Sequence, residues 1–90
     1  GEIRRNIFLS VKECLHNIVK HSGATCVKFS VELSSTIKIT IHDNGKGIDW
    51  NSIRAFSNGI QNIKNRMKDV NGEVNFSNKN GTKVVLTIPL

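Results

Sequence analysis

One edge of an expected N-terminal helix carries side chains that can bind cations and phosphate. At about 100° of rotation per residue, four polar residues fall within about a quarter turn of one another: Glu13, Asn17, Lys20 and His21. A carboxylate and a side-chain carbonyl one turn apart offer hard oxygen ligands for a cation, and the carboxylate can also accept a proton. The lysine and histidine one turn further along can hold phosphate oxygens. An ordinary solvated helix face carries the same residue types, so this edge alone does not establish a site.

A second polar group stands at the end of an expected strand. Asp43 follows Ile37, Ile39 and Ile41 at two-residue steps, so its side chain lies on the same face of the strand as theirs. Its carboxylate should therefore point toward the helices rather than into water. A carboxylate repels phosphates and accepts hydrogen bonds, so its natural partner on a nucleotide is the exocyclic amine of adenine. The glycines of the following segment 44–47, Gly45 and Gly47, leave the backbone free for close approach by a ligand. The same residues also suit a simple tight turn.

Two later segments repeat these patterns. Thr82 follows Gly81 and has the inward parity of the last strand, so its hydroxyl and the Asp43 carboxylate can converge on one spot. Ser57, Asn58 and Gly59 open the second expected helix, whose free N–H groups and positive dipole end favour phosphate. An N-cap with no ligand would have the same sequence.

The apolar spacing places these residues on six elements. Three- and four-residue steps predict helices from about Arg4 to His21 and from Ile60 to Val70, the second with Asn58 as a possible cap. The apolar stripe of the first helix consists of Ile7, Val11, Cys14, Leu15 and Ile18. Period-two alternation predicts a half-buried strand at Val27–Leu33 and a second strand at Ile37–Ile41. Two final strands are expected at Glu73–Ser77 and Thr82–Leu90, joined by a turn. This order predicts an α+β two-layer sandwich with helices on one face of a largely antiparallel sheet.

Composition indicates one small domain. The 90 residues, 38% of them hydrophobic, suffice for one modest core but not for two. No apolar run approaches the roughly 20 residues of a membrane-spanning helix, and we expect no membrane contact. Cys14 and Cys26 lack metal-binding spacing, which favours free buried thiols in a reducing cytoplasm.

The net charge of +6 suits any polyanionic partner. The basic residues are dispersed, and one Trp and four Phe give little surface for stacking bases. Charge alone does not choose among nucleic acid, an acidic membrane surface and nucleotide phosphates, but this composition argues against a base-stacking surface, and we expect no nucleic acid as a partner.

Four segments, in this order, resemble the GHKL ATPase superfamily and, within it, the short-lidded sensor histidine kinases of the nitrate-sensor and lipid-sensor type. KECLHNIVKHSGA, from Lys12, looks like the N box, and DNGKGI, from Asp43, looks like the G1 box. SNGIQNIKNRM, from Ser57, is similar to the G2 region, and NGTKVVLTIPL, from Asn80, to the G3 box and last strand. Ser57 stands where the G2 region often has its first glycine. The resemblance covers nearly the whole chain and implies the Bergerat ATP-binding fold with a mostly antiparallel mixed sheet.

The resemblance also implies a role for each matched residue. Glu13 would be the catalytic base or polariser near the γ-phosphate, and Asn17 would ligate Mg²⁺. Asp43 would accept a hydrogen bond from adenine. The remaining ATP-binding residues implied are Lys20, His21, Gly45, Gly47, Asn58, Gly59, Gly81 and Thr82.

A chain of this kind, residues 1–90, would be the ATP-binding catalytic domain of a histidine kinase. It would bind Mg-ATP and pass the γ-phosphoryl group to a histidine on the dimerisation domain of the same kinase, which signals to a response regulator. His21 belongs to the ATP-facing N box, and His16 and His42 lie in no acceptor-like context, so we expect little or no autophosphorylation by this chain. Three alternatives remain: a serine kinase of the anti-sigma-factor type, a non-catalytic nucleotide-binding module, and a small basic nucleic-acid binder.

Overall fold

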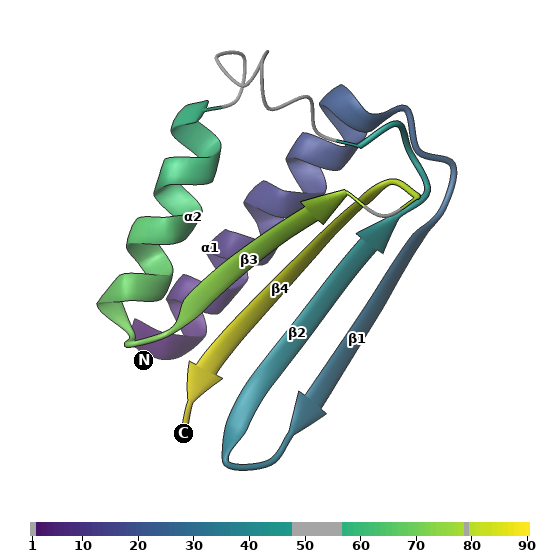
Figure 1. The fold of residues 1–90 in the computed structure, drawn as a ribbon. Coiled ribbons are helices and arrows are strands. Elements are labelled where there is room, and N and C mark those ends of the chain that lie inside the picture. Colours follow the sequence, from purple (N-terminus) through teal and green to yellow (C-terminus); the bar gives the residue numbers. More distant parts are fainter. Residues whose placement is uncertain (1, 48–56, 79) are drawn as a thin grey trace.

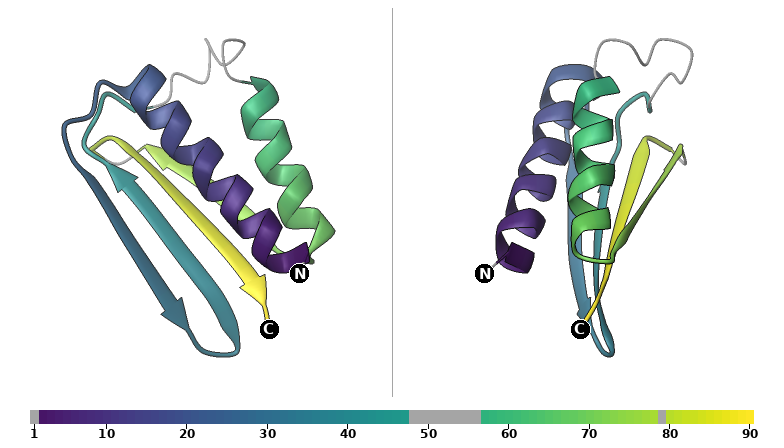
Figure 2. Two further views of the ribbon diagram at one scale, coloured as in Figure 1. Left: turned by 180° about the vertical axis from the view of Figure 1, so that it is seen from behind. Right: turned by 90° about the vertical axis from the view of Figure 1, so that its left-hand side faces the viewer.

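The computed structural model describes residues 2–47, 57–78 and 80–90, which form a helical layer on a β-sheet (Figure 1). In chain order the elements are α1 (Glu2–Asn17), the π-helical turn η1 (Ile18–Ser22), β1 (Val27–Leu33), β2 (Thr36–Asp43), α2 (Ser57–Asp69), β3 (Glu73–Asn78) and β4 (Thr82–Pro89). Figure 2 shows both helices on the same side of the sheet. The predicted α+β two-layer sandwich is therefore confirmed.

The described strands form one sheet in the order β1-β2-β4-β3. All three pairings between these strands are antiparallel. On β2 and β4 the alternation of the sequence becomes alternating burial, with every second residue inside. Because β2 and β4 are antiparallel neighbours, the last residues of β2 lie beside the first residues of β4 at one end of the sheet.

The core lies between the helices and the helix-facing side of the sheet. Its buried residues are Cys14, Ile18, Ile39, Ile41, Ile63, Met67, Val70, Val84, Leu86 and Ile88. Both helices contribute through three- and four-residue steps, as the sequence predicts. A long-range hydrogen bond from Asn6 Nδ2 to the Arg66 carbonyl (3.0 Å) joins the start of α1 to the end of α2. The two helices thus hold each other at a fixed place over the sheet.

The prediction that the strand at Val27–Leu33 is half-buried is wrong. All seven residues of β1 are exposed, although Phe29 and Val31 face the helical side of the sheet opposite Ile41 and Ile39. Leu15 of α1 is exposed as well. The physical reason is position, because β1 is the edge strand farther from the helices, which lie over β2, β4 and β3 instead (Figure 2).

Two helix boundaries differ from the expected ones. The α-helix ends at Asn17 and continues as a π-helical turn to Ser22, whose Oγ donates a hydrogen bond to the Ile18 carbonyl at 2.7 Å. Gly23, in the left-handed region with φ 66°, ends this turn as expected for a glycine C-cap. At the other helix, α2 begins at Ser57, so Asn58 lies inside the first turn rather than at the cap. Isolated π-turns in helices are frequent at functional sites.

The two cysteines occupy different environments. Cys14 is buried and Cys26 is exposed, so the expectation of two buried thiols is correct for Cys14 alone. Burial raises the pKa of the Cys14 thiol to about 12, with the neighbouring Glu13 carboxylate contributing in the same direction. Cys14 is therefore a protonated core residue at neutral pH. Among the described residues, no helix is long and apolar enough to cross a bilayer.

Candidate functional site

Asp43 is the last residue of β2, and its carboxylate lies under the helical layer. The side chain is 2% exposed, which confirms the inward parity predicted from Ile37, Ile39 and Ile41. Its Oδ1 accepts hydrogen bonds from the backbone N–H groups of Gly45 (2.7 Å) and Thr82 (3.3 Å). Its Oδ2 is buried and has no hydrogen-bond partner. One oxygen thus holds the carboxylate in place while the other is available to a ligand.

Thr82 opens β4 beside Asp43, and its side chain is 4% exposed. The hydrogen bond from the Thr82 backbone to the Asp43 carboxylate confirms that the two residues converge. Thr82 Oγ1 is also buried without a partner. An unsatisfied buried polar atom costs about 1 to 3 kcal/mol and is rare in native proteins, so two such atoms together need a ligand or ordered water. An acceptor-only oxygen beside a hydroxyl suits a ligand that presents an N–H group.

The glycines around Asp43 permit close contact between backbone segments. Gly81 has φ 114°, and a side chain there would overlap the Asp43 carbonyl oxygen and lie 3.0 Å from Asp43 Oδ1. A Cβ on Gly45 would lie 2.8 Å from the Ser22 Cβ. A Cβ on Gly47, whose φ is 84°, would lie 3.2 Å from the Asn78 side chain. At Gly45 and Gly81 the missing side chain therefore makes room for a neighbouring backbone segment, that of Ser22 and that of Asp43 respectively.

Asn44 is a positioning residue that the sequence reasoning did not single out. Its Oδ1 accepts hydrogen bonds from the backbone N–H groups of Thr25 (2.9 Å) and Cys26 (3.0 Å). Its Nδ2 donates to Thr25 Oγ1 at 3.0 Å. Asn44 therefore joins the end of β2 to the segment before β1 and holds the backbone next to Asp43. The only signal in the sequence is the tendency of asparagine to bond to nearby backbone groups in turns.

A second polar group lies where the end of α1 meets the start of α2. A Cβ built on Gly59 would overlap the Glu13 carboxylate and lie 3.5 Å from Asn17 Nδ2. Glu13 and Asn17 thus face the first turn of α2, where free N–H groups favour negative charge. Figure 1 shows the end of α1, the start of α2 and the end of β2 at the same end of the molecule.

The other predicted residues are only partly placed. Lys20 is exposed in η1, where π geometry replaces the α-helical spacing from which we placed Lys20 and His21. The side chains of His21 and Asn58 lie outside the described residues. Among the described residues, no three His, Cys, Asp or Glu side chains form a group that could hold a metal ion. A Mg²⁺ ion here would therefore depend on Asn17 and on oxygens of the ligand, which fits an ion commonly held by few protein ligands and substrate phosphates.

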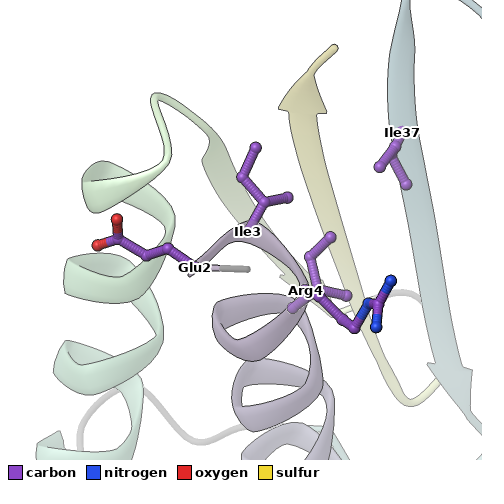
Figure 3. Close-up of a pocket in the computed structure, with 5 residues that line it drawn as sticks. Glu2, Ile3, Arg4 and Ile37 are labelled. Atoms are coloured by element: carbon purple, nitrogen blue, oxygen red, sulfur yellow. The ribbon is translucent and has the colours of Figure 1, made fainter.

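A separate hollow lies at the other end of α1 (Figure 3). It has a volume of about 690 Å³, is widely open, and is lined by Glu2, Ile3, Arg4, Ile7 and Ile37. Ile37 stands near the start of β2, whereas Asp43 ends that strand. The hollow has no unpartnered buried oxygen among its lining residues, so the candidate site is the Asp43 end of the sheet.

Comparisons with known proteins identify a family and relatives of this chain. Residues 3–90 match the family described as histidine kinase-, DNA gyrase B- and HSP90-like ATPases. Sensor histidine kinase YvfT of Bacillus subtilis is 36% identical over 85 residues, which is 93% of this chain and 22% of that protein. The nitrate/nitrite sensor protein NarX of Escherichia coli is 34% identical over 79 residues, which is 84% of this chain and 13% of that protein. The chain thus spans about a fifth of these relatives or less.

Two solved structures show the same arrangement of elements. The histidine kinase domain of a blue-light-activated kinase from Erythrobacter litoralis superposes with a TM-score of 0.83 at 25% identity, covering 99% of this chain and 45% of that one. The ATP-binding domain of PrrB from Mycobacterium tuberculosis gives a TM-score of 0.79 at 27% identity, covering 94% of this chain and 67% of that one.

Proposed function

The chain belongs to the family of histidine kinase-, DNA gyrase B- and HSP90-like ATPases, and on this premise we propose that it is the ATP-binding catalytic domain of a sensor histidine kinase. In this role it binds Mg-ATP and donates the γ-phosphoryl group to a histidine on a separate dimerisation domain of the same kinase. The phosphohistidine then supplies a response regulator. The observation that carries the proposal is the pair of buried, unpartnered oxygens Asp43 Oδ2 and Thr82 Oγ1.

Adenine fits this pair of oxygens chemically. Asp43 Oδ2 accepts hydrogen bonds and donates none, and the adenine amine is a donor. The Thr82 hydroxyl can donate to a ring nitrogen of the base or to a bridging water. Because Gly45 and Thr82 hold Oδ1 through their N–H groups, the carboxylate is oriented before the nucleotide arrives. Preorganisation of this kind lowers the entropic cost of binding.

The triphosphate would lie between the end of α1 and the first turn of α2. The amides of Asn58 and Gly59 belong to the first turn of a helix, where the dipole favours anions. Lys20 and His21 belong to η1, the turn that follows Asn17, and would add basic groups there. Asn17 offers a neutral carbonyl oxygen as a Mg²⁺ ligand, and the bound ion would neutralise phosphate charge during transfer.

In the transfer step the bond between the γ-phosphorus and the bridging oxygen of ATP breaks, and ADP leaves with the electron pair. A bond then forms between that phosphorus and an imidazole nitrogen of the acceptor histidine. Phosphoryl transfer depends mainly on alignment and charge stabilisation, which the residues at the ends of α1 and α2 would provide. Glu13 lies where α1 faces the first turn of α2, and its carboxylate can accept the proton from the acceptor imidazole or polarise the imidazole.

The proposal is tested by mixing the chain with γ-labelled Mg-ATP and the dimerisation domain of its parent kinase. We expect acid-labile label on a histidine of the dimerisation domain and little or no label on the chain alone. Stoichiometric phosphohistidine on the chain alone would contradict this assignment. Label on serine would indicate a serine kinase, and nucleotide binding without transfer would indicate a non-catalytic module.

A further inference from the structure

The direction of the Asp43 carboxylate depends on a backbone N–H group in the loop that follows β2. Gly45 N donates to Asp43 Oδ1 at 2.7 Å, whereas the hydrogen bond from Thr82 N to the same oxygen is longer, at 3.3 Å. Oδ2, the oxygen without a partner, shares the rigid plane of the carboxylate with Oδ1. The place of the Gly45 N–H group therefore sets where Oδ2 points.

The residues on both sides of Gly45 bind to the segment that runs from the end of η1 to β1. Lys46 N donates a hydrogen bond to the Ser22 carbonyl at 3.0 Å. Asn44 N donates to the Cys26 carbonyl at 3.2 Å. The Gly45 N–H group is therefore held in place by contacts with a part of the chain about 20 residues away in sequence.

The side chain of Asn44 adds three further hydrogen bonds to the same segment. Its Oδ1 accepts from the backbone N–H groups of Thr25 and Cys26, and its Nδ2 donates to Thr25 Oγ1. Asn44 and both of its partner residues are exposed, so they contribute little to the hydrophobic core. The amide of Asn44 therefore fixes the geometry of the loop more than it stabilises the fold.

We propose that Asn44 determines selectivity for adenine, acting through Gly45: its side chain fixes the loop whose N–H group orients the Asp43 carboxylate. This inference rests on the proposed function and adds to it a positioning residue that does not touch the base. Without the amide, backbone bonds alone hold the loop, and the carboxylate samples more orientations. Ordering it then costs entropy each time Oδ2 binds the adenine amine. A base that lacks the amine gains nothing from this order, so its binding should not depend on Asn44.

The fold should tolerate the loss of this side chain. Asn44→Ala removes an exposed amide and leaves the two backbone hydrogen bonds of the loop in place. We expect its melting temperature to fall by a few degrees, on the order of 5 °C. Thr25→Val is a milder second variant, because it keeps the branched shape and the backbone N–H group and removes only the oxygen that accepts from Asn44 Nδ2.

The test compares calorimetric titrations with Mg-ATP and with Mg-inosine triphosphate, whose base carries an oxygen in place of the adenine amine. The parent should prefer ATP by at least about tenfold. In Asn44→Ala this preference should fall to about threefold or less, through weaker binding of ATP, while the affinity for inosine triphosphate stays within about twofold of the parent's. Thr25→Val should lower the preference by about twofold. Asn75→Ala, which removes the same amide at an exposed position of β3, is the matched control and should keep the full preference.

Equal losses of affinity for the two nucleotides in Asn44→Ala would overturn the inference, because Asn44 would then serve the fold alone. An unchanged preference for ATP in this variant would overturn it as well. If Asn44→Ala does not fold, Thr25→Val decides, and its keeping the full preference would contradict the role of Asn44. Each of these results leaves the proposed function standing. A parent that does not bind Mg-ATP would refute both.

Discussion

Asp43→Asn should weaken Mg-ATP binding by about 1.5 to 3 kcal/mol, the usual worth of a hydrogen bond to a charged group. This corresponds to a rise in Kd of about 10- to 150-fold. The amide can keep Oδ1 as the acceptor for the Gly45 and Thr82 N–H groups. Its NH₂ group then replaces Oδ2, the oxygen without a partner, and opposes the adenine amine donor to donor. Calorimetric titration of both proteins with Mg-ATP measures the difference.

The matched control is Asp69→Asn, which makes the same chemical change at an exposed position at the end of α2. It should bind Mg-ATP as the parent does. Because Oδ2 makes no hydrogen bond within the protein, Asp43→Asn should also remain folded with a similar melting temperature. Equal affinities of the parent and Asp43→Asn would remove Asp43 from the base-recognition site.

Gly81→Ala should destabilise the domain by about 3 kcal/mol or more, because a strained backbone and a backbone overlap add together. Its φ of 114° lies outside the range that an alanine adopts readily, and the new Cβ would overlap the Asp43 carbonyl oxygen. The new Cβ and the Asp43 carbonyl oxygen are both fixed to the backbone and cannot rotate away from each other. The end of β2 and the start of β4 would therefore have to move apart. Thermal unfolding should show a fall in melting temperature of about 10 °C or more.

Gly23→Ala separates these two causes. Gly23 also has a positive φ, 66°, but a Cβ placed on it would have no heavy atom within 4 Å. Only the left-handed strain of about 1 kcal/mol remains, so the loss should be well under that of Gly81→Ala. Similar losses in the two variants would show that the contact between Gly81 and Asp43 contributes nothing to stability.

The inward direction of Asp43 and Thr82 could be predicted because side chains alternate along any strand, whatever packs on it. The same alternation could not predict that β1 stays exposed. It identifies which side chains share a face, but coverage of that face depends on where the helices lie. The contact of Glu13 with Gly59 joins residues far apart in the chain, and helix spacing gives no information about such a pair.

The glycines show a similar limit of prediction from the sequence. The sequence indicates where the backbone is free of side chains, but not whether a ligand or another backbone segment fills the space. At Gly45 the neighbour is Ser22, and at Gly81 it is Asp43. The π-helical turn η1 was also not predictable from apolar spacing, because five residues are too few to distinguish its period from that of an α-helix.

Recognition of the base depends on Asp43 Oδ2 accepting a hydrogen bond from the exocyclic amine of adenine. Inosine triphosphate differs from ATP at this group, where it carries an oxygen acceptor in place of the amine donor. Calorimetric titration of the parent chain in Mg²⁺ should give a Kd for ATP at least about tenfold lower than that for inosine triphosphate. Equal affinities for the two nucleotides would contradict this mode of recognition.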